Sequence, residues 1–214
     1  AEQNQVWVGM SKETAHQLGT PISSLLAWLE FLKLKNSDAE LLSEVEKDIK
    51  RLETITERFS KIGSTPVLKK ANIADVLNNS ITYLKTRSSK KIKYILNFSS
   101  EDEIFVSINI ALFEWVIENI CKNAMDAMEG DGTIDITVTD NTQVIYLDIK
   151  DTGKGIPKSK YKTIFHPGFT TKQRGWGLGL SLTKRIVEIY HSGKIFVKNS
   201  ELNRETTFRI VLKK

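Results

Sequence analysis

The 214-residue chain contains a single cysteine, Cys121, so no disulfide can form within it. A lone cysteine fits a reducing compartment, and we expect Cys121 to be a small buried helix residue. No run of residues approaches the ~20 apolar positions of a membrane span, and nothing resembles a signal peptide. Because the sequence opens at Ala1 without an initiator methionine, we expect it to be the cytoplasmic part of a longer protein.

The chain also lacks a block of charge of either sign. Lysine and arginine total 31 and aspartate and glutamate total 26, which gives a net charge of +5, and the two signs are interspersed. Binding of nucleic acid or anionic lipid normally uses a concentrated basic patch. We therefore expect no nucleic-acid partner. The hydrophobic content of 40% is enough for two small folded domains.

The first third of the chain has the pattern of a helical hairpin. Mostly apolar residues recur at spacings of three and four along two runs. They are Leu18, Ile22, Leu25, Leu29 and Leu32 in the first run, and Leu42, Val45, Ile49, Leu52, Thr56, Phe59 and Ile62 in the second. Cap-forming residues at 36–38 separate the runs. Since two helices bury such seams poorly by themselves, we expect two hairpins to form a dimeric four-helix bundle.

Histidine is rare, and only one of the three histidines, His16, lies in this hairpin. At ~100° per residue, His16 is more than a quarter turn from the apolar stripe, so we expect it to face solvent. Thr20 lies one turn later on the same face. Pro21 removes the hydrogen bond to the Gln17 carbonyl and should kink the helix beside the histidine.

Residues 63–66 read as a helix stop followed by an extended segment, which predicts domains at 1–64 and 67–214. The second domain alternates helix and strand. We expect helices from Asn72 to about Ser88, from Asn109 onward and over 178–190, with asparagine caps on the first two. The expected strands are 92–98, 104–108, 133–139, 144–150, 194–198 and 206–212. The fold class is then α+β, a helical hairpin followed by an α/β sandwich with helices on one face of a mixed sheet. The irregular stretch 156–177 is too long for an ordinary connection and is predicted to be a functional lid.

Five short motifs follow one another along the chain. They are HQLGTP at 16–21, NICKNA at 119–124, DTGKGI at 151–156, FHPGFTTK at 165–172 and GWGLGL at 175–180. Each is weak evidence by itself, because glycine-rich turns are common. In this order they resemble the H, N, G1, F and G2 boxes of the histidine protein kinases of two-component signalling. The resemblance covers nearly the whole chain and implies a Bergerat-type ATP-binding fold, shared with gyrase, mismatch-repair and chaperone ATPases.

The resemblance implies that neutral His16 attacks the γ-phosphate of Mg-ATP and passes the phosphoryl group to an aspartate on a response-regulator receiver domain. Asp151 would accept a hydrogen bond from the adenine amino group. Asn123 would ligate Mg²⁺ through its amide oxygen, and Asn119 would assist at the ion or the phosphates. Thr20 would hold a water for removing phosphate from the regulator, unless it only bonds the helix backbone.

The glycine-rich segments complete the expected nucleotide site. Gly153 and Gly155 would let the turn pass close to the purine without a side chain in the way. The start of the last helix would offer backbone amides to the phosphates. The residues expected there are Gly175, Gly177, Leu178 and Gly179. Lys172 and Arg174 fit a phosphate contact and solvated lid charges equally well.

Three residues depart from the family pattern. Gln17 stands where an acid usually follows the histidine, Gly19 where an arginine is usual, and Asp126 where the N box usually continues with a basic residue. An acid beside the histidine can stabilise the positive ring that forms during phosphorylation, whereas Gln17 brings no charge. We therefore expect autophosphorylation to be slow and the balance to shift toward phosphatase activity.

Two other classes of protein also fit part of this pattern. An ATP-hydrolysing clamp of the gyrase or chaperone type would share the nucleotide fold, but such clamps have a water-activating glutamate where this chain has Asn119. A non-catalytic dimeric scaffold that binds a response regulator is supported only by Gln17. The expected location is cytoplasmic, with any membrane attachment through segments absent from this sequence.

Overall fold

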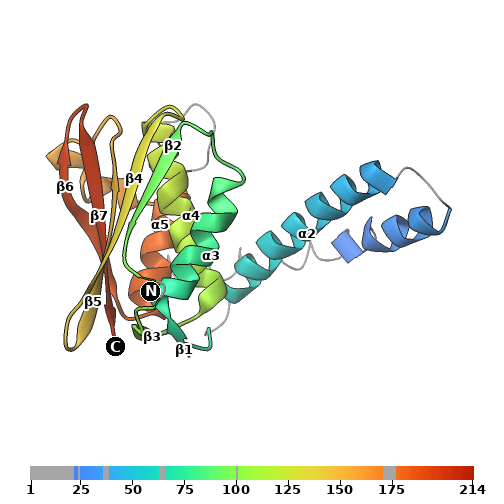
Figure 1. The fold of residues 1–214 in the computed structure, drawn as a ribbon, viewed down its shortest axis with the longest axis horizontal. Coiled ribbons are helices and arrows are strands. Elements are labelled where there is room, and N and C mark those ends of the chain that lie inside the picture. The colour runs from blue at the N-terminus through green and yellow to red at the C-terminus, as the bar shows by residue number, and fades with distance from the viewer. Residues whose placement is uncertain (1–21, 24, 36–38, 63–65, 100, 171–176) are drawn as a thin grey trace. The chain divides into compact units, whose positions relative to one another are not determined.

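The computed structural model describes residues 22–23, 25–35, 39–62, 66–99, 101–170 and 177–214. The chain divides into two compact units, residues 1–66 and 67–214. Each unit is described by itself (Figure 1). The predictions for His16, Gln17, Thr20, Lys172, Arg174 and Gly175 lie outside the described residues.

In the first unit, two helical segments pack on each other. Residues 25–34 are helical, and helix α2 spans Ala39–Ile62. Their shared core consists of Ile22 and Leu29 from the first segment and Leu42 and Ile49 from α2, with Leu26 packed against it. An ion pair also joins the two segments, because Lys33 Nζ lies 2.9 Å from the Glu46 carboxylate.

The second unit is built on a five-stranded mixed sheet with the order β2-β4-β5-β7-β6. The strands are β2 (Ile92–Asn97), β4 (Gly132–Asp140), β5 (Val144–Asp151), β6 (Lys194–Glu201) and β7 (Glu205–Lys213). Strands β2 and β4 are parallel and the other neighbours are antiparallel. These strands lie within a few residues of the predicted ones. The strand predicted at 104–108 is instead part of a separate two-stranded sheet, in which β3 (Phe105–Ile108) pairs with β1 (Lys69–Asn72).

Helices cover one face of this sheet (Figure 1). They are α3 (Ile73–Lys85), α4 (Ile110–Ala127) and α5 (Gly179–Arg185), and α5 continues into the π-helix η3 (Ile186–Tyr190). Both predicted caps are confirmed. Asn72 Oδ1 accepts a hydrogen bond from Ala74 N at 3.1 Å, and Asn109 Oδ1 accepts one from Leu112 N at 3.2 Å. The last predicted helix is right in extent, but its final turn is a π-helix.

Alternating apolar residues of the strands form the core with the inner faces of the helices. The sheet contributes Ile134, Ile136, Ile145 and Leu147, and α4 contributes Phe113, Val116 and Ile117, each 0% exposed. Cys121 is buried on α4, as expected, and burial raises the pKa of its thiol to about 12. Among the helices of the described residues, none is both long enough and apolar enough to cross a bilayer.

Candidate functional site

Helix α4 carries the two asparagines of the predicted site. Asn119 and Asn123 are one turn apart, so they lie on the same face of the helix, and both are half-buried. Asn119 lies beside α5, where its Nδ2 donates to Thr183 Oγ1 at 3.5 Å. Its Oδ1 lies 4.0 Å from the position that a Cβ on Gly179 would occupy. The structure therefore brings Asn119 to the start of the glycine-rich helix.

The turn after β5 docks on the other end of α4. Lys154 N donates to the Ala127 carbonyl at 3.1 Å. A Cβ on Gly153 would lie 2.7 Å from Ala127 Cβ, so only glycine allows this close approach. Ala127 is eight residues after Asn119, which places the two contacts about 12 Å apart along the helix. The turn that begins at Asp151 and the start of α5 thus contact α4 at two separate levels, at Ala127 and at Asn119.

The Asp151 side chain, at the end of β5, is 3% exposed. Burial raises the pKa of its carboxyl to about 6, while the hydrogen bond from Gly153 N at 2.8 Å opposes this shift and the charge of Glu205 adds to it. Near neutral pH the carboxylate is thus a desolvated hydrogen-bond acceptor that is close to taking up a proton.

The second half of this turn is held by the connection between β6 and β7. Gly155 has a φ of +75°, and a Cβ there would lie 2.4 Å from the Glu201 carbonyl oxygen. Asn203 N donates to the Lys154 carbonyl at 2.9 Å, and Ile156 N donates to Ser200 Oγ at 2.8 Å. Both glycines of the turn therefore have a role in packing. Their expected role in making room for a purine stays a prediction.

The predicted lid begins with two short 3₁₀ helices, η1 (Lys158–Lys160) and η2 (Thr163–Phe165). Within it, Gly168 N donates to the carbonyl of Gly177, the last residue of the predicted lid, at 3.1 Å. Gly177 has a φ of +64°, and a Cβ there would lie 2.5 Å from the Gly168 carbonyl carbon. Leu178 follows as the N-cap of α5, and since leucine has no side-chain acceptor, it leaves the first amides of α5 without a side-chain cap.

A buried histidine that the sequence did not single out as functional joins the two helices of the site at their far ends. His191 Nε2 accepts a hydrogen bond from Asn109 N at 3.0 Å, and its Nδ1 donates to the Ile186 carbonyl at 2.8 Å. The imidazole is therefore neutral, and burial lowers its pKa. No sequence signal points to this contact, because the two residues are far apart in the chain.

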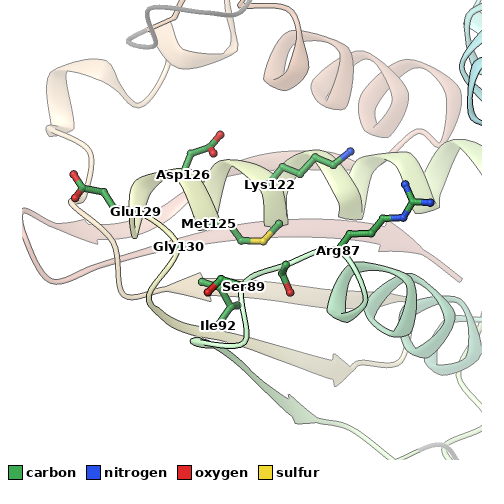
Figure 2. Close-up of a pocket in the computed structure, with 9 residues that line it drawn as sticks. Arg87, Ser89, Ile92, Lys122, Met125, Asp126, Glu129 and Gly130 are labelled. Carbon is green, nitrogen blue, oxygen red and sulfur yellow. The ribbon is translucent and has the colours of Figure 1, made fainter. Parts of the chain in front are cut away.

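The neighbouring flank of α4 lines an open cavity of about 680 Å³. Figure 2 shows Arg87 and Lys122 at one end of it and Asp126 and Glu129 at the other. None of the predicted nucleotide ligands is among its lining residues. Asp126, the N-box residue that departs from the family pattern, borders this cavity. The cavity is therefore separate from the predicted nucleotide ligands Asn119, Asn123 and Asp151.

The donor chemistry of the site suits a hard cation. Within the described ranges no cluster of three or more histidine, cysteine or acidic side chains could hold a metal by itself. The amide oxygens of Asn119 and Asn123 are hard neutral donors of the kind that Mg²⁺ accepts, and Mg²⁺ usually keeps several waters and phosphate oxygens as its other ligands. The residues therefore fit magnesium that arrives with a phosphate-bearing ligand.

Comparison with known proteins gives a consistent result. Residues 108–214 match the family described as histidine kinase-, DNA gyrase B-, and HSP90-like ATPase. Sporulation kinase A of Bacillus subtilis (strain 168) is 28% identical over 200 residues, which cover 92% of this chain and 33% of that protein. Sensor histidine kinase ZraS of Escherichia coli (strain K12) is 28% identical over 204 residues, which cover 92% of this chain and 43% of that protein. The chain thus spans less than half the length of these relatives.

Solved structures show the same relationship. The catalytic domain of histidine kinase ThkA is similar with a TM-score of 0.62 and 27% identity, over 69% of this chain and 95% of that one. The structure of histidine kinase ThkA in complex with response regulator protein TrrA is similar with a TM-score of 0.64 and 25% identity, over 100% of this chain and 63% of that one. These similarities confirm the predicted ATPase fold of mixed sheet and helices.

Proposed function

The chain belongs to the histidine kinase-, DNA gyrase B- and HSP90-like ATPase family, and from this premise we propose that it is the catalytic part of a sensor histidine kinase. In this proposal His16 takes the γ-phosphoryl group of ATP and passes it to an aspartate of a response regulator. The named complex of ThkA with TrrA supports a partner of that kind. The likeness to a protein named a sporulation kinase and to one named a sensor histidine kinase, each over 92% of the chain, supports the kinase reaction.

One observation carries the nucleotide assignment: the Asp151 turn and the glycine-rich helix contact α4 at two different levels. The Asp151 turn meets the helix at Ala127 and the glycine-rich helix meets it at Asn119. The spacing of about 12 Å suits an extended nucleotide. In our proposal the base lies at the Asp151 end and the phosphates at the Asn119 end.

Each side chain then has a defined task. The Asp151 carboxylate accepts a hydrogen bond from the adenine amino group, which guanine lacks at that position. The amide oxygen of Asn123 would hold Mg²⁺, and Asn119 would assist at the ion or the phosphates; the bound ion would offset the charge of the triphosphate. A His16 nitrogen forms a bond to the γ-phosphorus while the bond to the bridging oxygen breaks, and ADP leaves. Because an amide cannot act as a base toward water, Asn119 favours transfer to another nucleophile over hydrolysis.

The first unit supports a homodimer in this proposal. Besides the residues packed between its two helical segments, each segment leaves an apolar pair seven positions apart. These are Leu25 and Leu32, 45% and 41% exposed, and Val45 and Leu52, both 40% exposed. A repeat of seven residues is the seam of helices that pack against partner helices. A four-helix bundle made from two chains would bury both pairs.

Incubation of the protein with labelled ATP and Mg²⁺ tests the function. A kinase gives acid-labile, alkali-stable label on the protein, a clamp gives free phosphate, and a scaffold gives neither. His16→Ala should abolish the label. His166→Ala is the matched control, because His166 is exposed in the second unit. Label that persists in the His16 variant would overturn the assignment of the phosphoacceptor.

The reverse activity rests on Thr20 in this proposal. A hydroxyl one helical turn from the phosphoacceptor can hold a water in line with an aspartyl phosphate. Thr20→Ala should then lengthen the lifetime of the cognate phosphorylated regulator with ADP and Mg²⁺ present, and should leave phosphorylation of His16 unchanged. Equal lifetimes for the variant and the wild type would remove Thr20 from the mechanism.

A further inference from the structure

The hydroxyl of Ser200, near the end of β6, contacts three other polar groups. Its Oγ lies 2.8 Å from Ile156 N, 2.9 Å from the Glu205 carbonyl oxygen and 2.8 Å from Thr206 Oγ1. An amide N–H only donates and a carbonyl only accepts. The three contacts are therefore all hydrogen bonds when Ser200 accepts from Ile156 and Thr206 and donates to Glu205. A hydroxyl has one donor and two acceptor positions, so this arrangement uses all of them.

A β-bulge brings the Ser200 side chain to this place. The register of β6 shifts by one residue between Val197 and Asn199. Without the extra residue, regular alternation would turn Ser200 away from the face of the sheet that the helices cover. With it, Ser200 pairs with Thr206, which is itself the register partner of Asp151. Thr206 and Asp151 are both 3% exposed, so the bulge places the hydroxyl on the same covered face as the Asp151 carboxylate.

Ile156 is the last residue of the turn that follows Asp151. At the beginning of this turn, Gly153 N donates to Asp151 Oδ1 at 2.8 Å. At its end, Ile156 N donates to Ser200 Oγ. Only two residues separate Gly153 from Ile156, so a displacement at one end of the turn reaches the other. The position of the Gly153 amide at the carboxylate thus depends on the bond to Ser200.

We infer that Ser200 is a positioning residue for the base end of the nucleotide site. Its hydroxyl holds the turn so that the Gly153 amide stays on one oxygen of the Asp151 carboxylate. This inference rests on the proposed function, in which that carboxylate accepts a hydrogen bond from the adenine amino group. Ser200 itself does not contact the nucleotide. Without its hydroxyl, the Ile156 amide would lose its acceptor, and an unpaired amide in a partly buried place is unfavourable.

The first test uses no nucleotide. Amide hydrogen exchange is measured residue by residue in the wild type and in Ser200→Ala. In the variant, the Ile156 amide should exchange about tenfold faster, as expected for the loss of one hydrogen bond. The Gly153 amide should also exchange faster, although its own partner is unchanged. Unchanged exchange at Gly153 would refute the inference, whatever happens at Ile156.

The second test measures affinity for non-hydrolysable analogues of ATP and GTP in the presence of Mg²⁺. Ser200→Ala should bind the ATP analogue about threefold to tenfold more weakly, and the GTP analogue about as well as the wild type does. A general loss of folded protein would weaken both equally, so the ratio of the two affinities reports on the base end. In the Asp151→Asn background, Ser200→Ala should cause no further loss. An unchanged ratio, or additive losses, would overturn the inference.

Ser99→Ala is the matched control, because Ser99 Oγ also accepts a hydrogen bond from a backbone amide, that of Glu101 at 3.1 Å, in the exposed segment after β2. It should change neither the ratio of affinities nor the exchange at Gly153, and an equal fall of the ratio in this control would contradict the inference. A wild type that binds both analogues equally well would refute the base end of the proposed function. The exchange at Gly153 would still decide the role of Ser200.

Discussion

Asp151 gives the most direct test of the nucleotide site, because ionisation of its carboxyl should favour nucleotide binding but lower the stability of the fold. Replacement by asparagine keeps the shape of the side chain but removes the charge. The pKa of the buried carboxyl is raised from 3.8 to about 6, so the wild-type group is ionised at pH 7 and largely protonated at pH 5. A protonated carboxyl accepts hydrogen bonds poorly. Binding of adenine should therefore weaken as the pH falls through 6.

The size of this effect follows from the titration. If only the ionised form binds, a pKa of about 6 reduces affinity about tenfold between pH 7 and pH 5, whereas an ordinary aspartate would change it by only about a tenth. Asp151→Asn should bind ATP roughly tenfold or more weakly than wild type at pH 7, since it lacks a charge-assisted hydrogen bond. The two proteins should converge toward pH 5.

Stability should change in the opposite direction. Because the unfolded state releases this proton at lower pH than the folded state, ionisation of Asp151 lowers stability as the pH rises from 3.8 to about 6. A shift of this size corresponds to about 3 kcal/mol. Without nucleotide, Asp151→Asn should raise the free energy of unfolding at pH 7.5 by up to about 3 kcal/mol, and by much less at pH 4.

The assay is a titration of wild type and variant with ATP and GTP at pH 5, 6 and 7, together with urea unfolding at pH 4 and 7.5. The ratio of the two affinities at each pH cancels the protonation of the phosphates, which is the same for both proteins. A ratio that does not change with pH, or an unchanged preference for adenine over guanine in the variant, would refute the role of Asp151. A variant less stable than wild type at pH 7.5 would refute the argument from burial.

Three further predictions concern other parts of the chain. Gly177→Ala should weaken nucleotide binding more than Gly168→Ala. Both glycines have positive φ, but the added methyl group would lie 2.5 Å from a backbone atom at Gly177 and would have no atom within 4 Å at Gly168. Equal affinities of the two variants would contradict this. The stability advantage of the wild type over His191→Gln in urea unfolding should shrink as the pH drops below about 6.5, since burial lowers the pKa of His191 and protonation removes the acceptor for Asn109. A difference between the two proteins that stays constant with pH would disprove this. Gln17→Glu should speed autophosphorylation about threefold to tenfold by stabilising the positive ring, and a slower variant would show that Gln17 has a positive role.

The parts of the fold that depend on local sequence were predictable. Asn72 and Asn109 were predicted as caps because asparagine accepts from the first free amides of a helix, and both do so. The small sheet was missed because it depends on pairing between distant segments, such as Lys69 with Ile108. The π-helix was missed for a similar reason. Its last turn ends at His191, whose side chain is held by Asn109 on another helix.

The candidate site was predictable as a set of motifs but not as an arrangement. The order of the boxes assigned Asn119, Asn123 and Asp151, yet nothing in their spacing says that the Asp151 turn meets α4 at Ala127. Glycine was expected in the turn because a side chain would block the approach of a purine. The structure shows that Gly155 is also required by a close contact with the backbone at Glu201. The contact between Asn119 and Thr183 could not be predicted either, because the two residues lie on different helices and a threonine within a helix gives no indication of its partner.

All parts of the candidate site contact helix α4, so a movement of this helix would move all of them. Three segments that are distant in sequence attach to it at separate levels: His191 at Asn109, the start of α5 near Asn119, and the Asp151 turn at Ala127. A packed helix moves as a rigid element, so its contacts with base and phosphates cannot be adjusted independently. Changes at Asn109, far from the nucleotide, should therefore affect both ends of the site together. Changes at Gly177, next to the start of α5, should affect only the phosphate end.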